Sequence, residues 1–254
     1  MRTVSPIKAR PLRQAGESVR DSLLSLVLDK LFSLLFMSGA LWVLAVTEWF
    51  KYWRHANPSP VLYTTFAGAF SVYGLIRGYF LYRKVERLKL GLRGEETVGE
   101  YFNRLVAKGY RVFHDIPGEK GNIDHVIIST RGAFTVETKT RSKPAKGDAI
   151  VTFDGETLSF NNARSDDAAI RQAKAQAGQL KRILKEETGN DYSVQPVVVV
   201  PGWFVEGLPG SSGSDVWVLN PKSLHKWIDH EPEKISTDRV RLAATKLGQY
   251  IRRS

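Results

Sequence analysis

Residues 121–140, GNIDHVIISTRGAFTVETKT, decide the fold that this 254-residue chain forms. They contain two apolar segments rich in β-branched residues, separated by the turn signal Arg131-Gly132. This pattern predicts two neighbouring strands, and a turn this short makes them antiparallel. Because side chains alternate along a strand, Glu137 and Lys139 are expected on the same face of the second strand.

The sequence around this strand pair predicts one α/β domain over residues 93–254, with a mixed sheet flanked by helices rather than a regular doubly wound fold. Ser165 is the expected cap of a long helix, which Gly189 ends. The expected elements are a helix at 92–108, strands at 110–116, 123–130 and 133–140, a hairpin of 149–153 and 157–160, a helix at 166–187, strands at 194–203 and 215–220, and helices at 221–229 and 237–253.

Two acidic residues of the central strand pair are candidates for metal binding. Asp124 lies near the start of the first strand, and antiparallel pairing brings it close to Glu137. Two carboxylates that share a site repel each other unless a proton or a cation joins them. Mg²⁺ or Mn²⁺ suits such oxygen ligands and activates water for attack on a phosphate. The Lys139 ammonium, on the face of Glu137, is suited to orient that water or to stabilise negative charge.

Other interpretations of these residues stay open at this point. An E-x-K pair on a strand is more often a solvated ion pair, and a lone Asp after a turn is usually part of the turn. His125 follows Asp124, so its side chain points to the opposite face and is expected to pack in the core. The chain has no Cys, which excludes disulfides, thiolate metal sites and a Cys nucleophile.

Three segments taken together resemble the nuclease-related domain (NERD) family. They are G-x-x-G-E at Gly91, Gly94 and Glu95, G-N-I-D-H-V at residues 121–126, and E-x-K at Glu137 and Lys139. The resemblance covers roughly residues 88–205 and implies a restriction-endonuclease-like fold with a nuclease site.

By this resemblance, Glu95, Asp124 and Glu137 are the metal ligands, and Lys139 is the catalytic base or positions the water. The family also carries a Gln on the active-site face of a later helix, and Gln172 is the best match, although this chain has Ala168 and Ala169 where relatives tend to show N-P. The implied cofactor is Mg²⁺ or Mn²⁺, and the implied substrate is DNA, with RNA as the second choice. A basic cluster follows the site strand and is a candidate to hold the phosphate backbone or to solvate a loop: Lys139, Arg141, Lys143 and Lys146.

The first ninety residues predict a membrane hairpin that is anchored in the lipid bilayer. Uncharged runs at 31–47 and 56–76 are long enough for two transmembrane helices, expected at about 31–50 and 58–80. Tyr and Trp cluster near the ends of these runs, as interfacial aromatic residues do. A pair of buried core helices is the alternative, and a cleaved signal peptide fits less well because the first run begins about thirty residues into the chain.

The basic residues around the hairpin predict its orientation. Residues 1–90 hold 13 Lys and Arg against 5 Asp and Glu, whereas residues 91–254 hold 24 against 21. The basic excess flanks the two spans, so both termini are expected in the cytoplasm at the plasma (inner) membrane. The expected organisation is a basic segment at 1–30, the hairpin at 31–82, a basic linker at 83–92 and the nuclease-related domain at 93–254.

Two classes of function follow from the sequence. The first is a membrane-anchored, metal-dependent nuclease that hydrolyses phosphodiester bonds on the cytoplasmic side. The second is a non-catalytic module that binds nucleic acid or a protein at the membrane through a nuclease-like fold. The presence of all the expected site residues favours the enzyme, whereas the nearly neutral charge of residues 91–254 favours the binding module, since phosphate tracking normally needs a basic groove.

Overall fold

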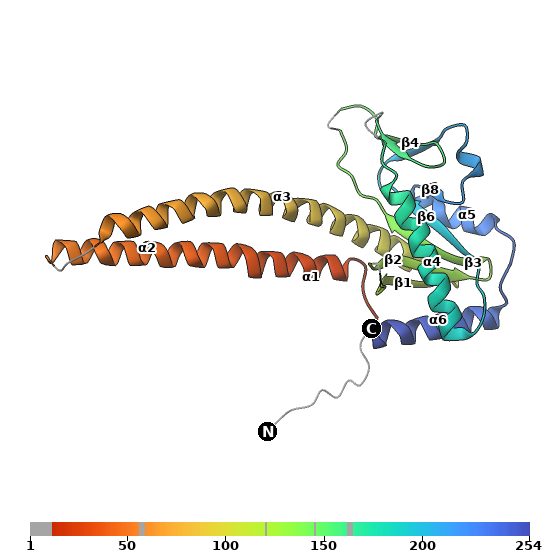
Figure 1. The fold of residues 1–254 in the computed structure, drawn as a ribbon. Helices are drawn as coiled ribbons and strands as arrows, with labels where there is room; N and C mark the ends of the chain where they lie inside the picture. Colours follow the sequence, from red (N-terminus) through yellow and green to blue (C-terminus); the bar gives the residue numbers. More distant parts are fainter. Residues whose placement is uncertain (1–11, 56–58, 120, 145, 162–164) are drawn as a thin grey trace, which may run out of the picture. The chain divides into compact units, whose positions relative to one another are not determined.

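A computed structural model of the chain describes residues 12–55, 59–119, 121–144, 146–161 and 165–254 (Figure 1). These residues form two compact units: residues 19–89 make one, and the segment before Val19 together with Leu90–Ser254 makes the other. Three of the basic residues that predict the orientation, Arg2, Lys8 and Arg10, lie outside the described residues, as does Pro58.

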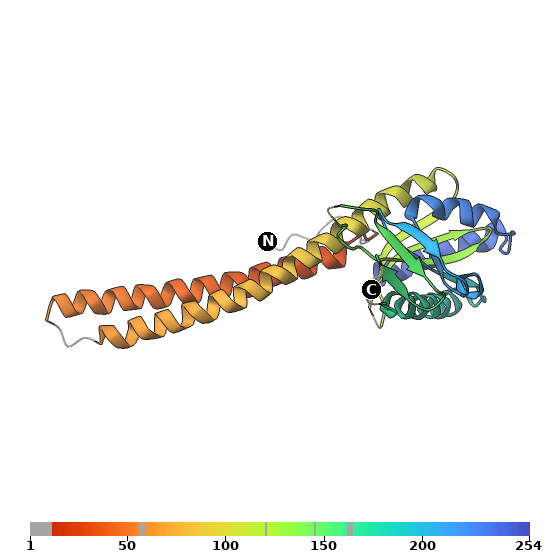
Figure 2. The same ribbon diagram turned by 90° about the horizontal axis from the view of Figure 1, so that it is seen from above.

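The unit of residues 19–89 is an antiparallel pair of helices. Its first arm consists of α1 (Glu17–Ser25), a π-helical turn η1 (Leu26–Leu31) and α2 (Phe32–Trp53); its second arm is the first part of α3 (Pro60–Val106). The arms run side by side in both views (Figures 1 and 2). Trp42 Nε1 donates to Ser71 Oγ at 2.9 Å, which joins the two arms.

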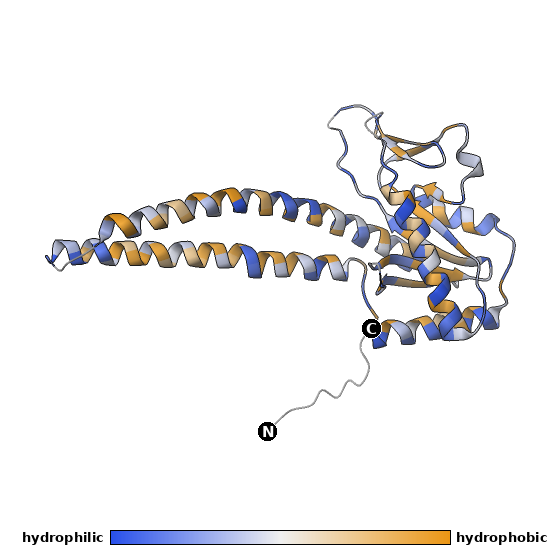
Figure 3. Ribbon diagram, in the orientation of Figure 1, coloured by the Kyte–Doolittle hydropathy of each residue, from blue (hydrophilic) through white to orange (hydrophobic). Residues whose placement is uncertain are grey.

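The outer surface of this helix pair is apolar. Figure 3 shows hydrophobic residues along α2 and the first part of α3, followed by hydrophilic residues further along α3. Leu35 and Phe36 are exposed although they are large and hydrophobic. Among the described residues, one continuous helix, Glu17–Trp53, is long and apolar enough to cross a membrane. The apolar part of α3 does not pass the same test.

The second unit is built on a five-stranded mixed sheet with the strand order β1-β2-β3-β6-β8. The strands β1 to β3 pair antiparallel as the short turns predict, and β6 and β8 add to them in parallel. Their bounds are β1 Arg111–Ile116, β2 Ile123–Ser129, β3 Gly132–Thr138, β6 Val194–Val199 and β8 Trp217–Leu219. The predicted mixed α/β architecture is therefore confirmed.

Helices cover both faces of this sheet. The residues of α3 from Leu90 onward and α5 (Leu224–His230) pack on one face, where Phe102 and Ile127 are fully buried. On the other face lie α4 (Ala168–Thr188) and α6 (Thr237–Arg253), which pack against Val126 and Ile128. Figure 2 shows α3 and α5 on one side of the strands and α4 on the other. Apolar burial on both faces is the main stabilising contribution to this unit.

A small second sheet, with the order β5-β4-β7, extends this unit. The predicted hairpin forms β4 (Ile150–Phe153) and β5 (Leu158–Phe160), but the sequence analysis missed β7 (Phe204–Gly207), which pairs with β4 in parallel. Short 3₁₀ turns, η2 (Ser211–Gly213) and η3 (Pro221–Ser223), flank β8. The prediction that Ser165 caps α4 is wrong. The Ser165 hydroxyl forms a hydrogen bond with the Ser159 hydroxyl, and the Ala168 amide donates to the Asp166 carboxylate instead.

The two glycines of the G-x-x-G-E pattern differ in their surroundings, and this difference can be tested. A Cβ atom at Gly94 would lie 1.8 Å from Thr140 Oγ1, whereas one at Gly91 would meet nothing within 4 Å. Gly91→Ala should stabilise the protein by up to about 1 kcal/mol, because alanine favours a helix. Gly94→Ala should destabilise it by about 1–3 kcal/mol through overpacking.

Chemical denaturation of the full chain in detergent measures both effects. Thr140→Ala should restore part of the loss in Gly94→Ala, because it removes the closest atom. Equal effects of the two glycine substitutions would contradict the close approach of α3 to Thr140.

Candidate metal and nuclease site

The pairing of β2 with β3 brings Asp124 and Glu137 to the same face of the sheet. His125 pairs with Val136, so the preceding Asp124 lies level with Glu137 across the two strands. The Asp124 carboxylate accepts a hydrogen bond from the Thr138 amide at 2.8 Å. This bond fixes the carboxylate at the end of β3, on the side that α4 covers.

The side chain that holds Glu137 comes from α4. Gln176 Nε2 donates to Glu137 Oε2 at 2.7 Å and to the carbonyl of Asn122 at 3.3 Å. Gln172, the glutamine that the sequence analysis assigned to this role, is exposed and is not brought to the site. The two glutamines lie one helical turn apart, and packing of α4 on the sheet selects the buried one.

Glu95 reaches the same site from the other layer. It lies on α3 immediately after Gly94, whose lack of a side chain lets the helix approach Thr140, two residues after β3. Burial raises the pKa of Glu95 most, and the negative charge of Asp124 raises it further. The site therefore gathers carboxylates from two layers of the fold.

The carboxylates destabilise one another in their charged forms. Burial raises the pKa of Glu137, and the charge of Asp124 adds to this, while the hydrogen bond from Gln176 opposes it. Burial also raises the pKa of Asp124 and outweighs the opposing effect of the Thr138 amide. Such a group favours a proton or a cation over three bare negative charges.

The donor set is chemically suited to a hard divalent cation, because carboxylate oxygens are the ligands that Mg²⁺ and Mn²⁺ prefer. Among the described residues, however, no three His, Asp or Glu side chains are already arranged to hold a metal ion.

Lys139 follows β3 and forms an ion pair that the sequence did not indicate. Its ammonium lies 3.6 Å from Asp166 Oδ2, while Arg141 Nη2 lies 3.0 Å from the same oxygen. The Arg141 guanidinium also lies over the Phe160 ring, 4.5 Å from its centroid. Of the predicted basic cluster, these two residues are engaged with Asp166, whereas Lys143 and Lys146 are exposed.

His125 is fully buried on the opposite face, as the alternation predicts. Its ring packs edge-on against Phe102, and its Nδ1 lies 2.8 Å from Nδ1 of His114. Burial lowers the pKa of both histidines, so both stay neutral near pH 7.

Asp115 is the acidic residue beside the site that the sequence analysis missed. It is 2% exposed, and its negative charge raises the pKa of both Asp124 and Glu95. The register pairs His114 with His125 and Ile116 with Ile123, which places Asp115 level with Asp124. An acid at a core-facing position of the apolar strand RVFHDI was the signal available in the sequence.

Comparison with known families supports the resemblance that the sequence suggested. Residues 90–201 match the model of the NERD family, described as a nuclease-related domain. This segment includes Glu95, Asp124, Glu137, Lys139 and Gln176, and the match indicates a nuclease-like function. No curated protein and no solved structure matches the chain.

The roles of the two glutamines on α4 can be separated by stability measurements. Gln176→Ala removes the hydrogen bonds to Glu137 and Asn122 and should destabilise the protein by roughly 2 kcal/mol. Gln172→Ala, the matched control at an exposed position one turn earlier on α4, should change stability by less than about 0.5 kcal/mol. Urea denaturation of the full chain measures both. A larger loss in Gln172→Ala than in Gln176→Ala would contradict the assignment of Gln176 to Glu137.

Proposed function

We propose that the chain is a membrane-anchored nuclease that hydrolyses phosphodiester bonds with Mg²⁺ or Mn²⁺, and that DNA is its substrate. The observation that carries this proposal is the group of three mutually repelling carboxylates, Glu95, Asp124 and Glu137, with Lys139 directly after the strand that carries Glu137. The family match over these residues and the mixed sheet support a restriction-endonuclease-like fold for this unit.

In this proposal, Asp124, Glu137 and Glu95 hold the cation. When bound, the cation would supply Lewis-acid activation of water and neutralise charge on the phosphate. Gln176 orients Glu137 through its amide, and the Thr138 amide orients Asp124. Lys139 would leave its long contact with Asp166 to hold the attacking water or to stabilise the developing negative charge.

Nucleic acid would approach along the loop after β3. Lys143 and Lys146 are exposed there and are suited to contact phosphates. Arg141 would contact a phosphate with its guanidinium, which is also paired with Asp166. Contacts of this kind depend strongly on salt and carry no sequence preference.

The apolar helix Glu17–Trp53 supports anchoring in a bilayer, and we propose α3 as the second span because it lies antiparallel beside α2. With both basic ends inside, the proposed location is the plasma (inner) membrane, with both termini in the cytoplasm.

A non-catalytic binding module at the membrane is the second candidate. The ion pair of Lys139 with Asp166 and the nearly neutral charge of residues 91–254 favour it. A nuclease assay on the full chain distinguishes the two candidates.

We expect the full chain, purified in detergent, to cleave DNA only with Mg²⁺ or Mn²⁺, and to be stabilised by the cation because the native state binds it. Asp124→Asn should abolish both effects, while its side-chain oxygen still accepts from Thr138. Lys139→Met should lower cleavage by about 10²-fold or more and keep the metal-induced stabilisation.

Lys226→Met is the matched control for this test, since Lys226 is exposed on α5, and it should cleave like wild type. Full activity in Lys139→Met would remove that residue from the chemical step. If wild type cleaves neither DNA nor RNA with any divalent cation, the binding module replaces the enzyme.

The orientation in the membrane can be tested with single cysteines, because the chain has none of its own. A membrane-impermeant maleimide should label Ser59→Cys, between the two helices, in intact cells. Ser254→Cys should react only after permeabilisation, and wild type provides the background. Labelling of Ser254→Cys in intact cells would overturn the proposed orientation.

A further inference from the structure

The segment before the helix Glu17–Trp53, together with the first two residues of that helix, belongs to the unit that contains the site. We name residues 12–18 the N-terminal strap; the strap belongs to the same compact unit as the sheet. Ala15 occupies the space at Gly99 on α3, where a Cβ atom would lie 2.4 Å from the Ala15 Cβ. Gly16 lies against Glu95, since a Cβ atom at Gly16 would be 3.7 Å from Glu95 Oε2.

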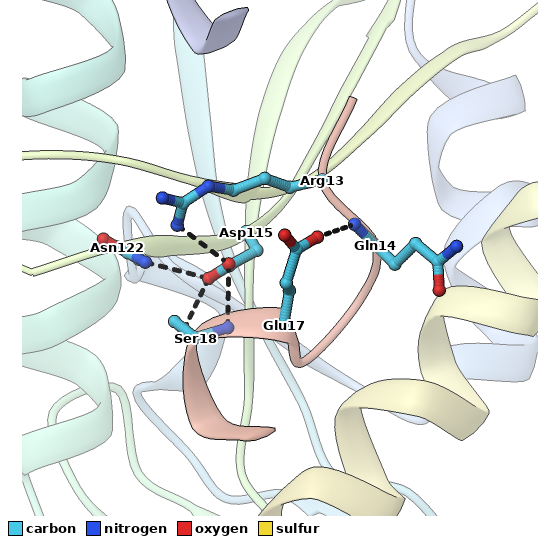
Figure 4. A network of polar contacts seen from close by, with 6 residues as sticks. All are labelled: Arg13, Gln14, Glu17, Ser18, Asp115 and Asn122. Carbon is cyan, nitrogen blue, oxygen red and sulfur yellow. Dashed lines mark hydrogen bonds and ion pairs between the residues drawn. The ribbon is translucent and has the colours of Figure 1, made fainter. Parts of the chain in front are cut away.

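The strap is held by the buried carboxylate of Asp115. Arg13 Nη1 lies 3.1 Å from Asp115 Oδ2, and the Ser18 amide donates to the same oxygen at 3.0 Å. The Ser18 hydroxyl donates to Asp115 Oδ1 at 2.6 Å. Figure 4 shows these groups converging on the carboxylate, together with Asn122.

Asp115 also has an unusual backbone conformation. Its φ of 49° is in the left-handed region, which a non-glycine residue inside a strand rarely adopts. Such a conformation persists when surrounding contacts determine it. The contacts here come from the strap and from Asn122.

Hydrogen bonds lead from Asp115 to the candidate catalytic carboxylates. Asn122 Nδ2 donates to Asp115 Oδ1 at 2.9 Å, and the Asn122 carbonyl accepts from Gln176 at 3.3 Å. Gln176 in turn holds Glu137. A continuous set of hydrogen bonds thus joins the strap to the acidic group. It passes through Asn122, which lies two residues before Asp124.

We propose that Arg13 and Ser18 are positioning residues of the metal site, and that they act through Asp115 and Asn122 on Gln176 and the carboxylates. The inference rests on the proposed function, because it assigns these residues to the same site. The site is then complete only when the strap is docked. Because the strap continues directly into the apolar helix, the site is linked to that helix through the strap.

The positive charge of Arg13 allows a positioning role to be distinguished from a purely electrostatic effect on cation binding. Removing a positive charge near a cation site should tighten cation binding if charge alone acts. Removing a positioning residue should weaken it, since partners of metal ligands typically contribute 10–100-fold to affinity. The two explanations therefore predict opposite signs for Arg13→Gln.

Titration of the full chain in detergent with MnCl₂, by calorimetry, tests this sign. We expect Arg13→Gln to raise the Kd for Mn²⁺ by about tenfold. Arg13→Lys, which keeps the charge but not the guanidinium geometry, should recover part of the loss. Arg104→Gln is the matched control, because Arg104 forms a surface ion pair on α3, 3.3 Å from the exposed Glu100. This variant should bind Mn²⁺ like wild type.

Two further variants test the route. Ser18→Ala removes one hydrogen bond to Asp115 and should weaken Mn²⁺ binding less than Arg13→Gln, which keeps the test decisive should Arg13→Gln fail to fold. Asn122→Ala by itself should weaken Mn²⁺ binding. Adding Arg13→Gln to this variant should change the Kd little further, because the hydrogen bond from Asn122 to Asp115 is already lost. Unchanged or tighter Mn²⁺ binding in both Arg13→Gln and Ser18→Ala would overturn the inference.

Hydrogen–deuterium exchange without metal separates this inference from the proposed function. In Arg13→Gln, or in Ser18→Ala if needed, peptides covering residues 121–126 and 135–140 should exchange faster than in wild type, because they contain Asn122 and the Thr138 amide. Peptides from β8 should not change. Unchanged exchange at 121–126 and 135–140 would overturn the positioning role. If wild type binds no Mn²⁺ but exchange responds as expected, the metal-dependent function fails and the positioning role of the strap stands.

Discussion

The repulsion among carboxylates that are buried or partly buried is the constraint on which the site depends. Glu95, Asp124 and Glu137 come from α3, β2 and β3 into one region, and burial raises the pKa of each. A fold gains nothing in stability from such a group, because each charge loses water and meets like charges. The hydrogen bonds from Gln176 and from the Thr138 amide oppose this effect, and a cation at the proposed site would oppose it further.

The surrounding structure supplies those donors from elements that are far apart in the sequence. The amide of Gln176 on α4 binds Glu137, and the end of β3 binds Asp124. Gly94 removes the side chain that would keep α3 away from Thr140. The two helical layers therefore do more than cover the sheet: each brings one part of the site to the end of the same two strands.

Much of the fold could be predicted from local sequence. The strands β1 to β3 and the helix α6 follow their hydrophobic periodicity, which reflects burial on one face or both. The strand β7 was missed because it is short and mostly exposed, so no alternation marks it. The sequence analysis named Gln172 alone, whereas Gln176 is the glutamine that bonds Glu137. Both residues lie on α4 one turn apart, and only contact with the sheet distinguishes the buried one.

The sequence by itself determined the mixed α/β class, the strand pair that carries Asp124 and Glu137, the opposite direction of His125 and the apolar character of the N-terminal helix. These properties depend on alternation and hydropathy, which act between near neighbours. Only the tertiary structure decided that Asp115 is buried and that Lys139 pairs with Asp166. It alone joined Arg13 to Asp115 across 102 residues of chain, because a buried charge selects its partner by position in space and leaves no period in the sequence.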